Sequence, residues 1–280
     1  MTGTKIIKLK LEEGRASETL PQLMGDDLMA AVKIFKRIEY GGNMHDYYDE
    51  ALKATKKMNI VPAAMMELPN LLKQEHSSEE NYGVTAGLYM TALMQNSPYS
   101  MFTVPNMPEV DGLGFKLKGD KRIIALGYVG KSLGSHMEGG SIHVMQSATD
   151  DVGLGMRGGE IRIDGNAGHR IGSRMEKGKI TVIGYGCDKV ADGMKGGKIE
   201  IGGSVGRGLG SHMEGGEIHV KGDVGMKLAF FMRGGKITVD GDIVSVSGTT
   251  VIAGGKSFLR MEDEIFGGEI WNKGERIFPK

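Results

Sequence analysis

The feature that most constrains this chain is a sequence period of 19 residues that begins near residue 120 and continues toward the C-terminus. Each copy carries a methionine, then a glycine pair with one lapse at Lys177, then an apolar–polar–apolar stretch. The recurring methionines are Met137, Met156, Met175, Met194, Met213 and Met232. Copies this short cannot bury an apolar face alone, so they must stack on one another.

Two positions in each copy are always apolar and are separated by one polar residue, which is typical of a half-buried β-strand. We call residues at the same position in successive copies a column. The two apolar columns are Ile142, Ile161, Ile180, Ile199, Ile218 and Ile237, and Val144, Ile163, Val182, Ile201, Val220 and Val239. We expect the isoleucine column to form one buried row in a parallel sheet.

The column that follows each methionine alternates in charge without exception, as Glu138, Arg157, Glu176, Lys195, Glu214 and Arg233. Equivalent residues of stacked parallel strands lie about 4.8 Å apart, so like charges in one column would repel. The alternation therefore favours in-register coils, a parallel β-helix, over a propeller or a sandwich.

Glycine accounts for 46 of the 280 residues, against a usual share of about 7%. One glycine column is expected to mark corners with left-handed backbone angles, which glycine adopts at little cost. Its members are Gly127, Gly165, Gly184, Gly203, Gly222 and Gly241. A weaker copy around Ile123 and a last copy at 267–270, after a 14-residue insertion, bring the expected stack to about eight turns.

The first hundred residues contain little glycine and show apolar residues at helical spacing. They predict a short strand at 6–11, a helix at about 26–40 with Asp26 as its N-cap, and a helix from an Asn43 cap to about Met58. A capping box of Ser77 and Glu80 predicts a further helix.

Prolines at 105 and 108 indicate a linker at 103–111. The predicted domains are therefore a helical N-terminal domain with its linker, 1–110, and a parallel β-helix, 111–280, with a non-repeat insertion near 242–264. The helical domain is expected to cover one end of the stack, and the insertion with residues 271–280 the other.

Lys+Arg and Asp+Glu balance at 35 each, so no basic surface for nucleic acid or anionic lipid is indicated. A single cysteine, Cys187, forms no internal disulfide and fits a reducing compartment. No stretch of 18 consecutive apolar residues occurs. We expect a cytoplasmic protein with neither nucleic-acid nor membrane partners.

Potential chemical motifs are better explained by the repeat. The string Gly153-x-Gly155-x-x-Gly158 matches a dinucleotide fingerprint, but its glycines belong to repeat columns and no helix is expected after it. His143 and His219 are expected on the outer strand face. His136 and His212 lie four turns apart, about 19 Å, too far to share a metal, and are expected on the solvated surface.

The remaining candidates also favour structural roles. Glu262, Asp263 and Glu264 indicate a solvated acidic loop, Cys187 occupies a corner that needs small residues, and the methionines fill the core. The sequence therefore predicts no catalytic, cofactor-binding or metal-ligating residue, and no cofactor.

The recurring phrase Met-x-Gly-Gly-x-Ile-x-Val-x-Gly resembles the GXGXG repeat family over about residues 112–274. That family includes the C-terminal domain of the glutamate synthase large subunit and the C subunit of formylmethanofuran dehydrogenase. The resemblance implies a right-handed parallel β-helix that acts as a scaffold against catalytic parts and supplies no catalytic residues.

We therefore expect a non-catalytic scaffold subunit of a cytoplasmic multi-subunit oxidoreductase, similar to the C subunit of formylmethanofuran dehydrogenase. Its partners would be the catalytic protein subunits, with docking at the helical domain and the 242–264 insertion. Two alternatives stay open: a stand-alone protein similar to the glutamate synthase C-terminal domain, and an independent enzyme or small-ligand binder with a site between helical domain and β-helix. Homo-oligomerisation stays open as well.

Overall fold

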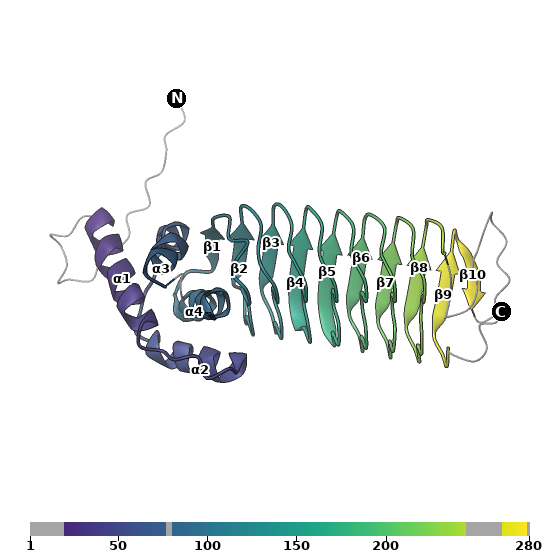
Figure 1. Cartoon of the computed structure of the whole chain (residues 1–280), viewed down its shortest axis with the longest axis horizontal. Coiled ribbons are helices and arrows are strands. Elements are labelled where there is room, and N and C mark those ends of the chain that lie inside the picture. The colour runs from purple at the N-terminus through teal and green to yellow at the C-terminus, as the bar shows by residue number, and fades with distance from the viewer. Residues whose placement is uncertain (1–19, 77–79, 245–264, 279–280) are drawn as a thin grey trace, which may run out of the picture.

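A computed structural model describes residues 20–76, 80–244 and 265–278 of the chain (Figure 1). Ten strands form one sheet in sequence order, in which β1 to β9 run parallel and β10 returns antiparallel to β9. The eight strands β2 to β9 belong to a solenoid of about 7 turns. The strands are β1 Met101–Val104, β2 Arg122–Ala125, β3 Ser141–Val144, β4 Arg157–Ile163, β5 Lys177–Val182, β6 Lys198–Ile201, β7 Glu217–Val220, β8 Lys236–Val239, β9 Glu269–Asn272 and β10 Glu275–Phe278.

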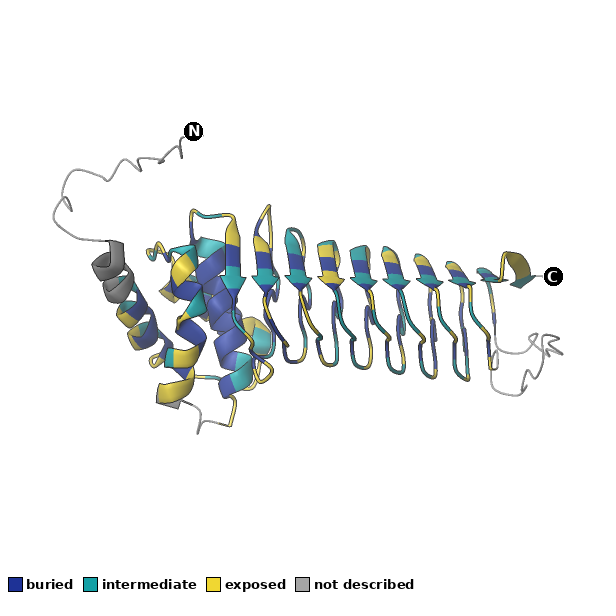
Figure 2. Cartoon of the chain, turned by 90° about the horizontal axis from the view of Figure 1, so that it is seen from above, coloured by how far each residue is buried: buried dark blue, intermediate teal, exposed yellow. Residues whose placement is uncertain are grey.

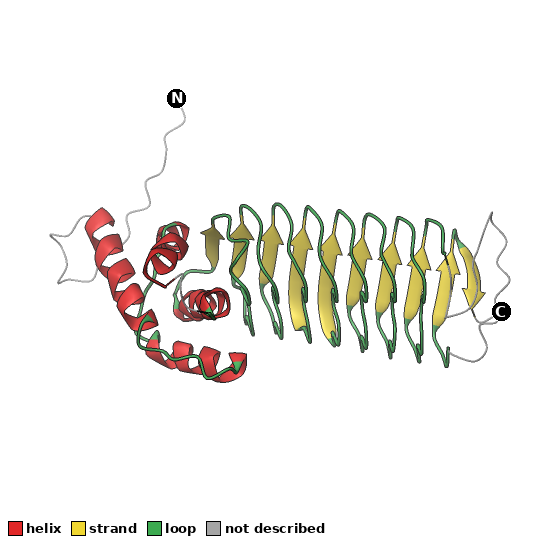
Figure 3. Ribbon diagram, in the orientation of Figure 1, coloured by secondary structure: helices red, strands yellow, loops and turns green. Residues whose placement is uncertain are grey.

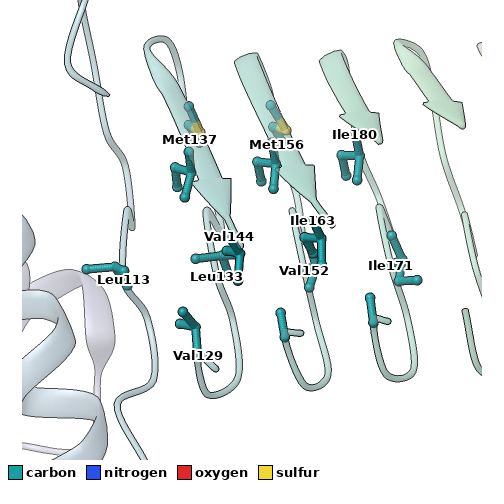
Figure 4. Packing of buried hydrophobic residues seen from close by; sticks show 14 of the residues in the cluster. Leu113, Val129, Leu133, Met137, Val144, Val152, Met156, Ile163, Ile171 and Ile180 are labelled. Carbon is teal, nitrogen blue, oxygen red and sulfur yellow. The ribbon is translucent and has the colours of Figure 1, made fainter. Parts of the chain in front are cut away.

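The predicted isoleucine row is confirmed. The first five isoleucines each pair with the one 19 residues further on, as Ile142 does with Ile161, and Ile237 pairs with Ile270 after the insertion. All six are at most 2% exposed. Their side chains and those of the methionines fill the narrow interior between the strands and the returning chain (Figure 4). Along strands β1 to β3 and β6 to β8, buried residues alternate with exposed or intermediate ones, which appear as bands (Figure 2).

The chain that returns from one strand to the next is an arc with its own hydrogen-bond ladder, drawn as loop in Figure 3. In the turn after β2, Ser132, Gly134 and His136 have φ of 60°, 62° and 55°. The N–H of Ser132 donates to Asp150 O of the next turn at 2.9 Å, whereas the N–H of Gly134 donates to Leu113 O of the previous turn at 2.8 Å. Alternating left-handed residues thus direct successive N–H groups to opposite neighbours, which satisfies the buried backbone.

The methionine column interlocks with a glycine column of the following turn. A Cβ added to Gly159, at φ +81°, would lie 2.6 Å from Met137 Cε and 2.7 Å from Gly140 O. The same relation joins Met156 to Gly178. Glycine is therefore required here both by the backbone angle and by the methyl group beneath it.

The lapse at Lys177 coincides with an irregular register. Between β4 and β5 the pairing changes, from Arg157 opposite Lys177 to Glu160 opposite Lys179. Lys177 N still donates to Met156 O, at 3.3 Å, as Gly158 N does to Met137 O, so the turn keeps its backbone hydrogen bond without the glycine.

The expected left-handed corner column is wrong. Gly165 and Gly184, like the other members of that column, do not have positive φ. They are glycines because the turns approach closely: a Cβ on Gly165 would lie 2.4 Å from Gln146 O, and one on Gly184 would lie 2.1 Å from Asn166 Oδ1. The left-handed positions lie instead in the return arc and in the glycine column above the methionines, as at Gly159 and Gly178.

The N-terminal region is helical, as expected, with shifted boundaries. The helix predicted at 26–40 starts earlier and ends at Phe35, so Asp26 lies inside it and is not its N-cap. Asn43 does cap the second helix, accepting a hydrogen bond from His45 N at 2.9 Å. The elements are α1 Leu20–Phe35, α2 Met44–Ala54, a 3-10 helix at Pro62–Met66, α3 Leu68–His76 and α4 Tyr82–Asn96.

Two of the predicted N-terminal features fall outside the described residues, namely the strand at 6–11 and Ser77 of the capping box. The N-cap of α4 is Asn81. The predicted linker at 103–111 overlaps the sheet, because β1 pairs with β2 and Met107 bridges to Val129. The sheet therefore begins ten residues before the predicted boundary at 111, since a strand of only four residues gives a weak sequence signal.

Helix α4 lies against the first turn of the solenoid (Figure 1). Gly114 N donates to Thr91 Oγ1 at 2.8 Å, and Lys118 N donates to Gln95 Oε1 at 3.0 Å. A Cβ on Gly87 would lie 1.8 Å from Asp111 O, so the helix backbone touches the turn directly. The helices thus cap this end of the stack, as the exposed edge of a solenoid requires.

At the other end, β10 covers the edge of β9. The insertion is outside the described residues from 245 to 264, including Glu262, Asp263 and Glu264. The repeat resumes where the sequence predicted it: Ile265 is buried, and Phe266 N donates to Met232 O at 2.7 Å.

The glycine–methionine interlock predicts a large difference between two glycine substitutions. Gly178→Ala places a Cβ 2.8 Å from both Gly159 O and Met156 Cε at φ +100°, whereas Gly119, at φ +71°, has nothing within 4 Å. We expect Gly119→Ala to lower the free energy of unfolding by about 1–2 kcal/mol through its backbone angle alone. Gly178→Ala should add about 1–3 kcal/mol for overpacking. Urea denaturation measures both, and equal losses would contradict the interlock.

Candidate functional site

A ladder of side-chain oxygens stabilises the corner at which each turn leaves its strand. In this column, a side chain accepts a hydrogen bond from the backbone N–H of the equivalent residue one turn later, at 2.7–3.1 Å. Such bonds satisfy donors that the sharp corner removes from the sheet. The acceptor–donor pairs are Asn106–Tyr128, Ser147–Asn166, Asn166–Tyr185, Ser204–Asp223 and Asp223–Asp242.

Tyr128 and Tyr185 interrupt this ladder. Each occupies the acceptor position but extends a phenol ring instead, and the two residues are about half exposed, at 50% and 53%. Within the described residues, no side chain accepts from the N–H of Ser147 or Ser204, which follow the two tyrosines by one turn. The two positions therefore lose a structural bond and gain an exposed aromatic ring.

Three further exposed apolar residues lie two positions before this column. Leu126, Met145 and Ile183 are 42–49% exposed. They share one column, in which Asp164 stands between Met145 and Ile183. Together with Tyr128 and Tyr185 they form what we call the apolar edge. Exposed Tyr and Met side chains are enriched at protein-interaction surfaces.

The return arcs carry a second surface feature, a groove of about 490 Å³ that we call the basic groove. Four cations line it, together with two carboxylates, Glu176 and Glu214. The cations are Arg157, Arg174, Lys195 and Arg233. They come from the alternating column and from the arc column of His136, in which Gly193 leaves a hollow, whereas the His136 ring fills the space over Gly155.

The alternating charge column is in register, because Arg157 N donates to Met137 O and Glu176 N donates to Met156 O. One pair of neighbours in the column approaches within ion-pair distance, Arg157–Glu176 at 3.6 Å, and Glu138 pairs with Lys118, which lies beside the column, at 3.1 Å. Among the described residues, Lys195 forms no ion pair with either neighbour in the column. The alternation of charge therefore mainly prevents repulsion between like charges along the column, and it forms few ion pairs.

His143 and His219 lie on the outer strand face, as predicted. Their Nε2 atoms lie 2.7 Å from Asp164 Oδ2 and 2.8 Å from Asp240 Oδ2, respectively. In the arc, His212 Nδ1 lies 2.9 Å from Asp192 Oδ1. These are oriented surface pairs, and no group of three or more potential metal ligands occurs in the part of the chain that the structure describes.

His136 is less solvated than expected, because its side chain is partly buried. Its ring packs against His45 of α2, with centroids 5.0 Å apart, and against Phe115 at 5.7 Å. Burial lowers the pKa of His136, and the nearby His45, Arg157 and Lys116 lower it further against the opposing effect of Glu176. The repeat places His136 on the outer face, but only the tertiary fold shows that α2 covers it.

The dinucleotide-like string lies in a return arc. Gly153 and Gly155 have φ of 65° and 61°, and strand β4 rather than a helix follows them. The helix N-terminus that holds the pyrophosphate in dinucleotide folds is therefore missing here. At Cys187, burial and the neighbouring Asp188 and Asp150 raise the pKa of the thiol, the opposite of what a reactive cysteine needs.

No family model matches the sequence, and no curated protein matches it. Among helices in the described ranges, none has the length and apolar character that a membrane crossing requires.

The environment of His136 predicts a pH dependence of stability. Because its folded pKa lies below the unfolded value of about 6.5, the unfolded chain takes up the proton more readily as the pH falls. Neutral His136 therefore stabilises the fold above about pH 6.5, and this stabilisation is lost as the pH falls through the folded pKa. We expect His136→Gln to reduce the drop in unfolding temperature between about pH 7.5 and pH 5. His219→Gln, on the open strand face, serves as the control and should not reduce that drop.

Proposed function

We propose that this chain is a non-catalytic scaffold that docks protein subunits of a larger complex on its solenoid. The observation that carries the proposal is the apolar edge. Tyr128 and Tyr185 stand where the repeat otherwise places Asn, Ser or Asp that bond to the next turn. Positions that depart from a local structural rule without a structural gain are expected to serve function.

The composition of the rest of the solenoid supports a structural role. The methionines, the glycine columns and the corner oxygens each have a contact that explains them. In the described part of the chain, no group of three or more His, Cys, Asp or Glu side chains is arranged to hold a metal ion. A rigid stack with an exposed apolar edge suits the assembly of other chains.

The resemblance to the GXGXG repeat family supports a more specific version of this proposal. In that version the partners are the catalytic subunits of a cytoplasmic oxidoreductase, and the chain takes a place similar to that of the C subunit of formylmethanofuran dehydrogenase. The single cysteine supports a reducing compartment. Partner subunits can dock on the helical domain and the 242–264 insertion in addition to the apolar edge. In the alternative proposal, a stand-alone protein similar to the glutamate synthase C-terminal domain would bind its partners at the same edge.

The apolar edge predicts that stability and partner binding can be separated. Changing Tyr128 and Tyr185 together to Asn, the residue at positions 106 and 166 of the same column, provides acceptors for Ser147 N and Ser204 N. We expect the unfolding temperature to stay equal or rise, because a missing hydrogen bond is supplied. Partner binding should weaken at least about tenfold, as expected when aromatic anchors are removed.

Affinity purification of the tagged full chain from its source measures partner binding, and size-exclusion chromatography with light scattering measures self-association. Met226→Gln is the matched control, since Met226 is 53% exposed and lies on the solenoid outside the edge. Wild-type recovery of the same catalytic chains with the double variant would contradict docking at this edge. Turnover by the isolated wild-type chain would contradict the scaffold role.

A further inference from the structure

The basic groove contains a hollow that the fold does not require. Gly193 lies in an arc column whose other members include His136, Arg174, His212 and Phe231, all with φ of 54–55°. Side chains therefore occupy this left-handed position in other turns. A Cβ on Gly193 would meet only Arg174 Cγ, at 3.7 Å. Unlike the glycines above the methionines, Gly193 leaves a space that packing would allow a side chain to fill.

The cations around this hollow are not neutralised by partners. Among the described residues, Arg174, Lys195 and Arg233 form no ion pair, although ion pairs are common elsewhere on the solenoid. Arg174 flanks the hollow from the turn before Gly193, and Lys195 lies two residues after it. Unpaired cations beside an open space form a site for an oxyanion, because Arg and Lys donate several charge-assisted hydrogen bonds.

His212 closes the hollow from the turn after Gly193. The bond between its Nδ1 and Asp192 fixes the ring and leaves Nε2 for another partner. On the other side of Arg174, the groove has an apolar floor at Leu154 and Gly155. Leu154 stands in a column that holds Ser135 one turn before and Ser173 one turn after, so this apolar side chain is also a departure from the repeat.

The charge pattern limits the kind of ligand. Glu176 and Glu214 lie on either side of Lys195 in the alternating column, so the positive charge is broken up along the groove. A long polyanion would meet these carboxylates, whereas a compact anion would fit between them. The volume of about 490 Å³ is larger than a bare oxyanion needs and is in the range of small-molecule sites.

We propose that the basic groove binds a small organic anion, with its oxyanion between Arg174 and Lys195 over Gly193, and its apolar body over Leu154 beside the His136 ring. His212 Nε2 supplies a further polar contact to the oxyanion. This site goes beyond the scaffold role and does not depend on the apolar edge.

The test uses the full chain and three probes: phenyl phosphate, benzoate and inorganic phosphate, each titrated by calorimetry. Phenyl phosphate tests a phosphate with an apolar body, and benzoate a carboxylate with the same body. We expect saturable binding of at least one aromatic anion and weaker binding of inorganic phosphate. If neither aromatic anion binds saturably, the proposal is wrong.

Four variants, two of them drawn from the repeat itself, locate the site. Arg174→Gln and Gly193→Phe, the latter copying Phe231 of the same column, should each raise the Kd of the bound anion at least about tenfold. Leu154→Ser, the residue of the neighbouring turns, should raise the Kd of the aromatic anion about fivefold and leave that of inorganic phosphate unchanged. Arg162→Gln is the control, because Arg162 lies on the strand face and pairs with Asp164 at 2.8 Å.

Circular dichroism and the unfolding temperature of each variant establish that it is folded. If binding survives in folded Arg174→Gln and Gly193→Phe, or weakens equally in Arg162→Gln, the anion binds elsewhere and the proposal is overturned. Because none of these residues belongs to the apolar edge, a failure here leaves partner docking unaffected.

Discussion

The structure depends on one constraint, which is that equivalent residues of successive turns stack in register. Each side chain must therefore be compatible with the equivalent side chains of the turn before and the turn after. Three hydrogen-bond ladders meet this constraint: two between backbone groups, in the strands and the return arcs, and one from backbone N–H groups to side-chain oxygens at the corners. Glycine above each methionine lets the turns approach, and alternation of charge prevents repulsion along an exposed column. A residue that differs in type from the rest of its column is therefore informative, and both proposals above start from such residues.

The repeat made most of the solenoid predictable. A buried isoleucine row needs only the period and the alternation of apolar residues, and the resumption of the repeat at Ile265 needs only a count of residues. The role of the glycines was harder to predict. Sequence shows that a column needs glycine but not whether the cause is a backbone angle, as at Gly159, or a close approach of backbones, as at Gly165.

The remaining differences have tertiary causes. His136 belongs to a regular column, and only the position of α2 and Phe115 makes it partly buried. Strand β1 was not predicted, because it lies beside prolines and has no strong local pattern. It is a strand because it pairs with β2. The candidate surfaces could have been predicted from the sequence. Tyr128, Tyr185 and Leu154 each replace a polar residue of their column, and this replacement is informative once the structural role of the column is known.

The scaffold account assigns partner binding to side chains that differ from the rest of their repeat column. Hydrogen exchange measured by mass spectrometry tests this claim most directly. The tagged chain is compared alone and in the complex purified from its source. The account predicts slower exchange in the complex for peptides that contain Tyr128, Met145 and Tyr185, and unchanged exchange at the equivalent corner around Ser204 and Asp223. Unchanged exchange at the tyrosine corners, with protection confined to other parts of the chain, would contradict it.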